Sequence, residues 1–227
     1  PHSMHGRAPA PRPMLSIHKI VLAAALRYVG YLTAADAHGD YYLAGGDTPS
    51  AAPGAWLGDL AVELGLDADV TAAELAATMA GGNGDRIAAH DLTLSAPSSV
   101  TAAWVLADPG LRAALQHAHD QAIRETFRHI ERAFPIVRRR QGGAIAREPA
   151  ADLLAAAFAH HTARQTDGQA AAGLPPDPQL HSHLVLLGLA RRRDGRLVAV
   201  DSLALFRGRA EAGAVYRAAL AAGLAAL

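Results

Sequence analysis

The sequence has 227 residues, 51% of them hydrophobic, and 21 basic residues balance 21 acidic ones to a formal net charge of zero. This length is typical of one domain with a sizeable core. The uncharged apolar runs are too short for a membrane span and no secretory signal is recognisable, so a cytoplasmic protein is expected. Because cysteine is absent, only histidine and carboxylate side chains remain as metal ligands, and the neutral charge excludes a global field that attracts nucleic acid.

Apolar spacing and local start and stop signals predict a mixture of helices and strands. Asp108-Pro109 is a strong helix start, and Asp194-Gly195 is a strong hairpin turn. In chain order, we expect a strand at 14–20, a helix at 21–36, two modest helices at about 56–64 and 71–80 (the second with a Thr71/Glu74 capping box), a strand at 90–97, a long helix from Pro109 to about Phe134, two or three strands within 136–163, a hairpin within 180–202 and a helix at about 209–226. Helices mixed with antiparallel strands, without βαβ alternation, predict an α+β two-layer sandwich with a central antiparallel sheet flanked by helices.

The ends of the chain carry expectations of their own. Residues 1–13 are rich in proline and lack periodicity, which is typical of a disordered leader or tag, so the domain is expected over 14–227. Because the sequence stops inside an expected helix, we expect the domain to be truncated at its C-terminus.

Two histidines stand two apart in the segment Asp177-Pro-Gln-Leu-His-Ser-His, directly before an apolar run. Residues two apart on a strand share a face, so His181 and His183 can both reach one ion, but the site needs a third donor. His160 and His161 end a second apolar stretch, and either one completes a three-imidazole cluster if the two strands are neighbours. Taken alone, such a pair is as consistent with a structural strand edge as with a metal site.

Tyrosines and arginines are unevenly distributed. Four of the five tyrosines lie near the start of the chain, as Tyr28, Tyr31, Tyr41 and Tyr42, and tyrosine can act as a covalent nucleophile. Packing is the alternative interpretation, and we favour it for the last two. Two groups of three consecutive arginines can bind phosphate or can simply be solvated turns: Arg138, Arg139, Arg140 and Arg191, Arg192, Arg193.

Several segments together resemble the MobF class of conjugative relaxases, the TrwC/TraI-like members of the HUH endonuclease superfamily. They are Met-Leu-Ser-Ile at 14–17, the tyrosine region from Gly30, Asp-Leu-Thr-Leu-Ser-Ala-Pro at 91–97, Phe-Ala-His-His-Thr-Ala-Arg at 158–164 with the His181/His183 motif, and Gly-Ala-Val-Tyr-Arg-Ala-Ala-Leu at 213–220. The resemblance covers nearly everything from Met14 onward. It implies the relaxase palm fold and a strand-specific enzyme that cuts single-stranded DNA at an origin of transfer. Such an enzyme stays attached to the DNA through a 5′-phosphotyrosine and can rejoin the strands.

The resemblance also implies roles for particular residues. His160 joins His181 and His183 as metal ligands, with His161 as a possible substitute. Tyr31 is the implied nucleophile. Where the family usually has two consecutive tyrosines, this chain has Tyr31 followed by Leu32, and Tyr28 lies one helical turn earlier. Asp91 orients a ligand histidine or helps to deprotonate the tyrosine, and the arginine groups contact the DNA backbone.

Cofactor, partners and rival functions follow from the same resemblance. The cofactor is a divalent metal, Mg²⁺ or Mn²⁺, with Zn²⁺ or Ni²⁺ as ions that can bind in vitro, since neutral imidazoles suit later metals better than Mg²⁺. Expected partners are origin DNA, relaxosome accessory proteins and a downstream helicase region. The alternatives are a rolling-circle replication initiator, a transposase, an inactive DNA-binding module and an unrelated metal-dependent hydrolase.

Overall fold

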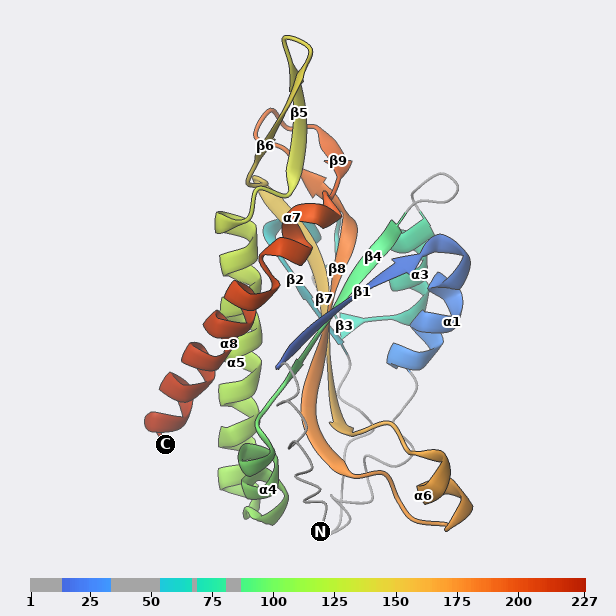
Figure 1. Cartoon of the computed structure of the whole chain (residues 1–227), viewed down its shortest axis with the longest axis vertical. Helices are drawn as coiled ribbons and strands as arrows, with labels where there is room; N and C mark the ends of the chain where they lie inside the picture. The colour runs from blue at the N-terminus through green and yellow to red at the C-terminus, as the bar shows by residue number, and fades with distance from the viewer. Residues whose placement is uncertain (1–13, 34–53, 67–68, 81–86) are drawn as a thin grey trace, which may run out of the picture.

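One antiparallel sheet organises the part of the chain that the computed structural model describes, which comprises residues 14–33, 54–66, 69–80 and 87–227. Its strand order is β1-β4-β8-β7-β2-β3, and β9 pairs with the end of β8. The strands are β1 (Leu15–Val21), β2 (Gly54–Leu57), β3 (Asp69–Val70), β4 (Ile87–Ser95), β7 (Asp152–Thr162), β8 (Pro178–Arg191) and β9 (Leu197–Ala199). Two further strands, β5 (Val137–Gln141) and β6 (Ala144–Glu148), form a separate ribbon that projects from the body (Figure 1).

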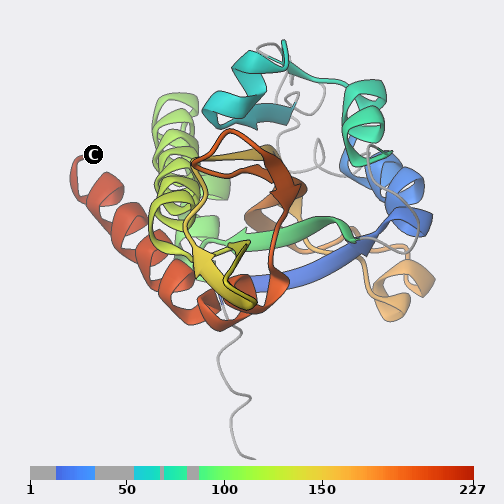
Figure 2. The same cartoon turned by 90° about the horizontal axis from the view of Figure 1, so that it is seen from above.

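Helices cover both faces of this sheet. The eight helices of the described ranges are α1 (Leu22–Thr33), α2 (Asp59–Glu63), α3 (Ala72–Ala80), α4 (Ser98–Leu106), α5 (Pro109–Ala133), α6 (Asp167–Ala171), α7 (Ser202–Arg207) and α8 (Arg209–Ala225). The long helices α5 and α8 lie on one face, and α1 and α3 lie on the other (Figures 1 and 2). None of these helices is both long and apolar enough to pass through a lipid bilayer.

The central strands explain why helices are needed on both sides. In β8 the run from Leu184 to Leu187 is buried at every position, with even-numbered residues packed towards α5 and odd-numbered ones towards α1. A strand that is apolar on both faces must be covered twice. The expected central antiparallel sheet flanked by helices is therefore confirmed, and the helices lie on both sides of it rather than in a single second layer.

Most local expectations are confirmed. The Asp108 carboxylate accepts from the backbone N–H of Gly110 at 2.9 Å and of Leu111 at 3.0 Å, and α5 begins at Pro109. The Thr71/Glu74 capping box forms at the start of α3, with bonds of 3.1 and 3.2 Å. The turn between β8 and β9 has Gly195 at φ 83°, a conformation that glycine adopts without strain.

One expectation about the first half is wrong, and one helix there was not expected. Residues 54–57 form β2, and the helix expected at 56 begins only at Asp59, because the β2 backbone pairs with β7. Gly54 permits this pairing, since a Cβ atom there would lie 2.4 Å from the Phe158 ring. Helix α4 was not expected from the sequence, because its apolar residues are spread around the helix and give no helical periodicity. Residues 1–13, Tyr41 and Tyr42 lie outside the described ranges.

Candidate active site

Three histidines meet on the α1 face of the sheet because of the pairing between β7 and β8. In that pairing His160 lies directly opposite His181, and His183 lies two residues further along the same face. The ring centroids are 5.5 Å apart for His160 and His181, 4.9 Å for His160 and His183, and 5.2 Å for the third pair. One nitrogen atom from each ring lies within 4.8 Å of the other two. The expected three-imidazole cluster is therefore present.

The three nitrogens fit a single metal ion. Metal–nitrogen bonds of about 2.1 Å place the ligand atoms of a tetrahedral site about 3.4 Å apart, so small side-chain rotations close the cluster. His181 donates from Nδ1 to the carbonyl oxygen of Gln179 at 3.1 Å, which leaves its Nε2 lone pair available to bind an ion. Burial lowers the pKa of His181 to about 4, so the imidazole is neutral at pH 7, as metal binding requires.

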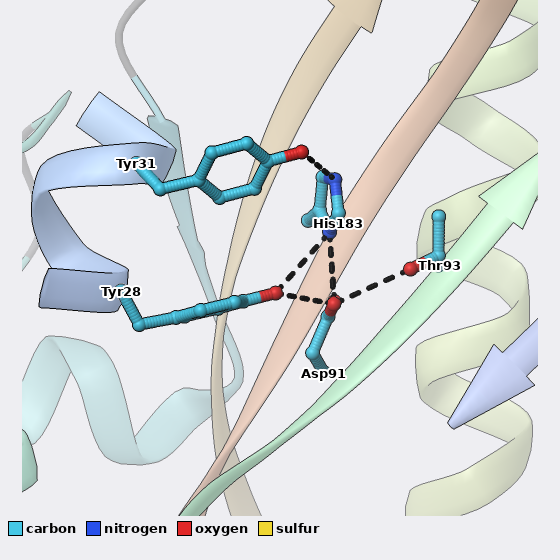
Figure 3. A network of polar contacts seen from close by, with 5 residues as sticks. All are labelled: Tyr28, Tyr31, Asp91, Thr93 and His183. Atoms are coloured by element: carbon cyan, nitrogen blue, oxygen red, sulfur yellow. Dashed lines mark hydrogen bonds and ion pairs between the residues drawn. The ribbon is translucent and has the colours of Figure 1, made fainter. Parts of the chain in front are cut away.

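Asp91 on β4 orients His183 from behind. Its carboxylate accepts from His183 Nδ1 at 3.0 and 2.9 Å and also from the hydroxyls of Tyr28 and, at 3.3 Å, Thr93 (Figure 3). Burial alone would raise the pKa of Asp91, but these hydrogen bonds, led by that of His183, hold it below its usual value. The carboxylate therefore fixes the proton on Nδ1 and leaves Nε2 for an ion. Sequence reasoning missed Thr93, whose place two residues from Asp91 on one strand face was the available signal.

The two tyrosines of α1 approach His183 from different sides. The Tyr31 hydroxyl lies 3.4 Å from His183 Nε2, and its ring packs edge-on against His160 and His183, each at 5.6 Å (Figure 3). The Tyr28 hydroxyl instead donates to Asp91 and lies 3.5 Å from His183 Nδ1. Burial and the adjacent Asp91 charge raise the pKa of Tyr28 far above its usual value, so it stays protonated. Tyr31, which is 44% exposed, is the tyrosine that faces the ligand nitrogens.

His161 does not belong to this cluster. It lies on the opposite face of β7, where its ring stacks on Trp104 at 4.7 Å and its Nε2 lies 3.3 Å from Gln116 Oε1. The structure thus places His160, and not His161, in the three-histidine cluster. The other helix histidines lie elsewhere, as expected: His129 pairs with Glu211 at the surface, and His119 is buried on the α5 side.

A family model described as TrwC relaxase matches residues 25–227. The chain belongs to the TrwC relaxase family. None of the curated protein sequences matches it significantly.

Solved structures of TrwC itself agree with this assignment. The metal-bound complex of conjugative relaxase TrwC with oriT DNA is 30% identical with a TM-score of 0.72, over 93% of this chain and 69% of that one. A copper-bound complex is 32% identical with a TM-score of 0.71, over 93% and 70% of the two chains. TrwC complexed with a 27-mer DNA that comprises the recognition hairpin and the cleavage site is 28% identical with a TM-score of 0.69, over 93% and 68%.

In this TrwC-family chain the arginine groups lie away from the histidines. Arg191 is eight residues beyond His183 on β8, about 26 Å at about 3.3 Å per residue. Arg191 and Arg192 each pair with nearby carboxylates, whereas Arg193 is exposed. Residues 138–140 lie on β5, in the projecting ribbon (Figure 1). Any DNA contact that these arginines make is therefore remote from the three-histidine cluster.

Proposed function

We propose that this chain is a relaxase domain, spanning residues 14–227, that nicks one strand of DNA at an origin of transfer and initiates conjugative transfer. The observation that carries the proposal is the meeting of the Tyr31 hydroxyl with the three-histidine cluster at His183 Nε2. A nucleophile beside a metal site is the arrangement that phosphoryl transfer to a side chain requires. Membership of the TrwC relaxase family, whose named member is solved with oriT DNA, supports it.

Tyr31, Asp91 and Tyr28 have different roles in the proposed reaction. Tyr31 Oη attacks the scissile phosphorus in line, the P–O3′ bond breaks, and the phenol proton is lost as the 3′ oxygen gains one. The product is a 5′-phosphotyrosine, which retains the energy of the phosphodiester, so a 3′ hydroxyl can reverse the reaction and rejoin the strand. Asp91 holds His183 in the ligand orientation, and Tyr28 holds Asp91. Tyr28 is therefore a positioning residue rather than a second nucleophile in this proposal.

The proposed cofactor is a divalent cation held by His160, His181 and His183. When bound, it would neutralise negative charge on the non-bridging oxygens of the scissile phosphate. Three neutral imidazoles favour Mn²⁺ and later ions such as Ni²⁺ or Zn²⁺ over Mg²⁺, which prefers oxygen ligands. The copper-bound complex of TrwC is consistent with such a donor set.

The direct test uses an oligonucleotide that contains the chain's own nick site. We expect a covalent protein–DNA adduct with Mn²⁺, visible as a shifted band on a denaturing gel, and its loss when EDTA is present. An adduct of undiminished yield in EDTA would exclude the proposed metal role. Tight, metal-independent binding without any adduct would instead favour an inactive DNA-binding module, and hydrolysis of a small ester without DNA would favour an unrelated hydrolase.

The β5–β6 ribbon is proposed as a second DNA contact. A two-stranded ribbon is narrow enough for the major groove of a duplex, and Arg138, Arg139 and Arg140 lie along one of its strands. Arg138 is 53% exposed and 3.8 Å from Asp201, a carboxylate that Arg147 already approaches at 2.6 Å. The ribbon thus carries more arginines than carboxylates, and the positive charge in excess favours phosphate binding. Arg191, Arg192 and Arg193 are proposed as weaker contributors, because the first two are paired with carboxylates.

Replacement of Arg138 and Arg140 by glutamine should weaken DNA binding without abolishing chemistry. Each lost phosphate contact reduces the slope of log K against log salt by about 0.7–0.9, so the double variant should lose about 1.5 from that slope. Fluorescence anisotropy of a labelled origin hairpin across a salt series measures it. Arg128→Gln is the control, because this exposed arginine of α5 is already paired with Glu125 and belongs to neither arginine group. An unchanged slope in the double variant would contradict the ribbon contact.

Relaxase action also implies partners and a location. Under this proposal the chain acts on origin DNA in the cytoplasm, alongside relaxosome accessory proteins and a helicase region. A rolling-circle initiator or a transposase would use the same chemistry on a different DNA site, so the sequence of the DNA that is nicked distinguishes them.

A further inference from the structure

A chain of three buried polar side chains crosses the core behind the histidine cluster. His119 on α5 has its Nδ1 atom 2.8 Å from the Tyr216 hydroxyl on α8 and its Nε2 atom 2.9 Å from the Ser182 hydroxyl on β8. His119 and Tyr216 are completely buried, and Ser182 is 2% exposed. Both nitrogens of the imidazole are therefore satisfied, and the chain links the C-terminal helix to the middle of the sheet.

The point at which this chain reaches the sheet is the residue between two proposed metal ligands. Ser182 lies between His181 and His183 on β8, and alternation along the strand turns its hydroxyl towards α5 while both histidines face α1. Its neighbours across the sheet are Leu94 on β4 and Ala159 on β7, so it lies in the interior of the sheet. A hydrogen bond to Ser182 therefore fixes the backbone that carries both imidazoles.

A second bond from the helices reaches the same segment. The backbone N–H of Leu180 donates to the Thr101 hydroxyl of α4 at 3.3 Å, one residue before His181. Further along β8, the residues that face α5 are apolar, as at Leu184 and Leu186. Among the described residues, the side-chain hydrogen bonds from α4 and α5 to β8 thus lie at Leu180 and Ser182, on either side of His181.

Stability alone does not account for a polar chain in this core. Replacing both partners of a buried hydrogen bond by apolar groups of similar shape is often nearly neutral. A fully satisfied network, in contrast, fixes distances and directions that apolar packing leaves adjustable. Two imidazoles on one strand converge on an ion only if the strand has a suitable tilt and twist. The hydrogen bond to Ser182 constrains this tilt and twist.

We propose that Tyr216, His119 and Ser182 are positioning residues that hold β8 so that His181 and His183 converge with His160 on one ion. They act through the strand and touch neither the ion nor the DNA. The inference rests on the proposed metal site, and it gives a role to the α8 segment around Tyr216.

The test measures metal affinity in the absence of DNA. Ser182→Ala should weaken Mn²⁺ binding about threefold to tenfold in isothermal titration calorimetry, somewhat less than the loss typical of a group that contacts a ligand directly. Tyr216→Phe, which keeps the ring and removes the hydroxyl, should weaken it in the same direction by a smaller factor. Ser182→Thr should retain the Mn²⁺ affinity of the unsubstituted protein, because threonine keeps the hydroxyl. A cavity of about 110 Å³ beside Ser182 can accept the added methyl group.

Thr126→Val is the matched control. Thr126 is fully buried on α5, and its hydroxyl donates to the carbonyl oxygen of Ala122 in the same helix at 2.7 Å rather than to β8. It should lower the melting temperature and leave the Mn²⁺ affinity unchanged. Unaltered affinity in Ser182→Ala, or an equal loss in Thr126→Val, would overturn the positioning role. If the unsubstituted protein binds no Mn²⁺ at all, the proposed metal site itself fails.

Discussion

Tyr31→Phe is expected to abolish the covalent DNA adduct, with a fall in its rate of formation of about a thousandfold or more. The substitution removes the hydroxyl that lies 3.4 Å from His183 Nε2 and leaves the ring packing against His160 and His183. Denaturing gels with a labelled nick-site oligonucleotide measure the rate. Melting temperature and Mn²⁺ affinity should stay close to those of the unsubstituted protein, because neither requires this hydroxyl.

Tyr28→Phe is the matched control, since it removes a hydroxyl one helical turn earlier. Its hydroxyl bonds to Asp91 and not to the ligand side of His183, so adduct formation should continue at a rate lowered about tenfold, as for a group that orients a ligand. Peptide mapping of the adduct should find the DNA on Tyr31. An adduct that persists in Tyr31→Phe and disappears in Tyr28→Phe would reverse the assignment of the nucleophile.

His160→Ala is expected to weaken Mn²⁺ binding by more than about a hundredfold, since even groups that only support a ligand contribute tenfold to a hundredfold. The loss follows from the geometry, because His160 lies opposite His181 and its ring is 4.9 Å from that of His183. Two imidazoles then remain, and an incomplete site binds metal weakly. Calorimetric titration of Mn²⁺ measures the effect, and adduct formation should be lost with it.

The adjacent histidine provides the control for this substitution. His161→Ala removes a ring that stacks on Trp104, so it should destabilise the fold by about 1 kcal/mol and leave Mn²⁺ affinity within about twofold. Thermal unfolding and calorimetry separate the two effects. Equal losses of Mn²⁺ affinity in His160→Ala and His161→Ala would contradict the assignment of His160 as the metal ligand.

Sequence patterns predicted the features that depend on neighbouring residues. The Asp108-Pro109 helix start, the Thr71/Glu74 cap and the Asp194-Gly195 turn all form from contacts within a few residues. The same holds for the shared face of His181 and His183, since strand geometry alone turns residues two apart to one side. The motifs also indicated the relaxase family, which the family model confirms.

Only the tertiary structure decided between residues that the patterns left equivalent. Both faces of β7 are buried, so alternation could not distinguish His160 from His161, and the pairing with β8 and the packing of α1 made the choice. Tyr28 and Tyr31 are likewise one turn apart on α1, and the placement of that helix over β4 and β8 sets which hydroxyl meets Asp91 and which meets His183 Nε2.

The bond between Ser182 and His119 had no sequence signal, because it joins residues 63 positions apart. Local sequence therefore determined which side chains could form a site on each element. Long-range strand pairing and helix packing determined which of them meet, since a difference of one residue in a strand or a fraction of a turn in a helix points a side chain elsewhere.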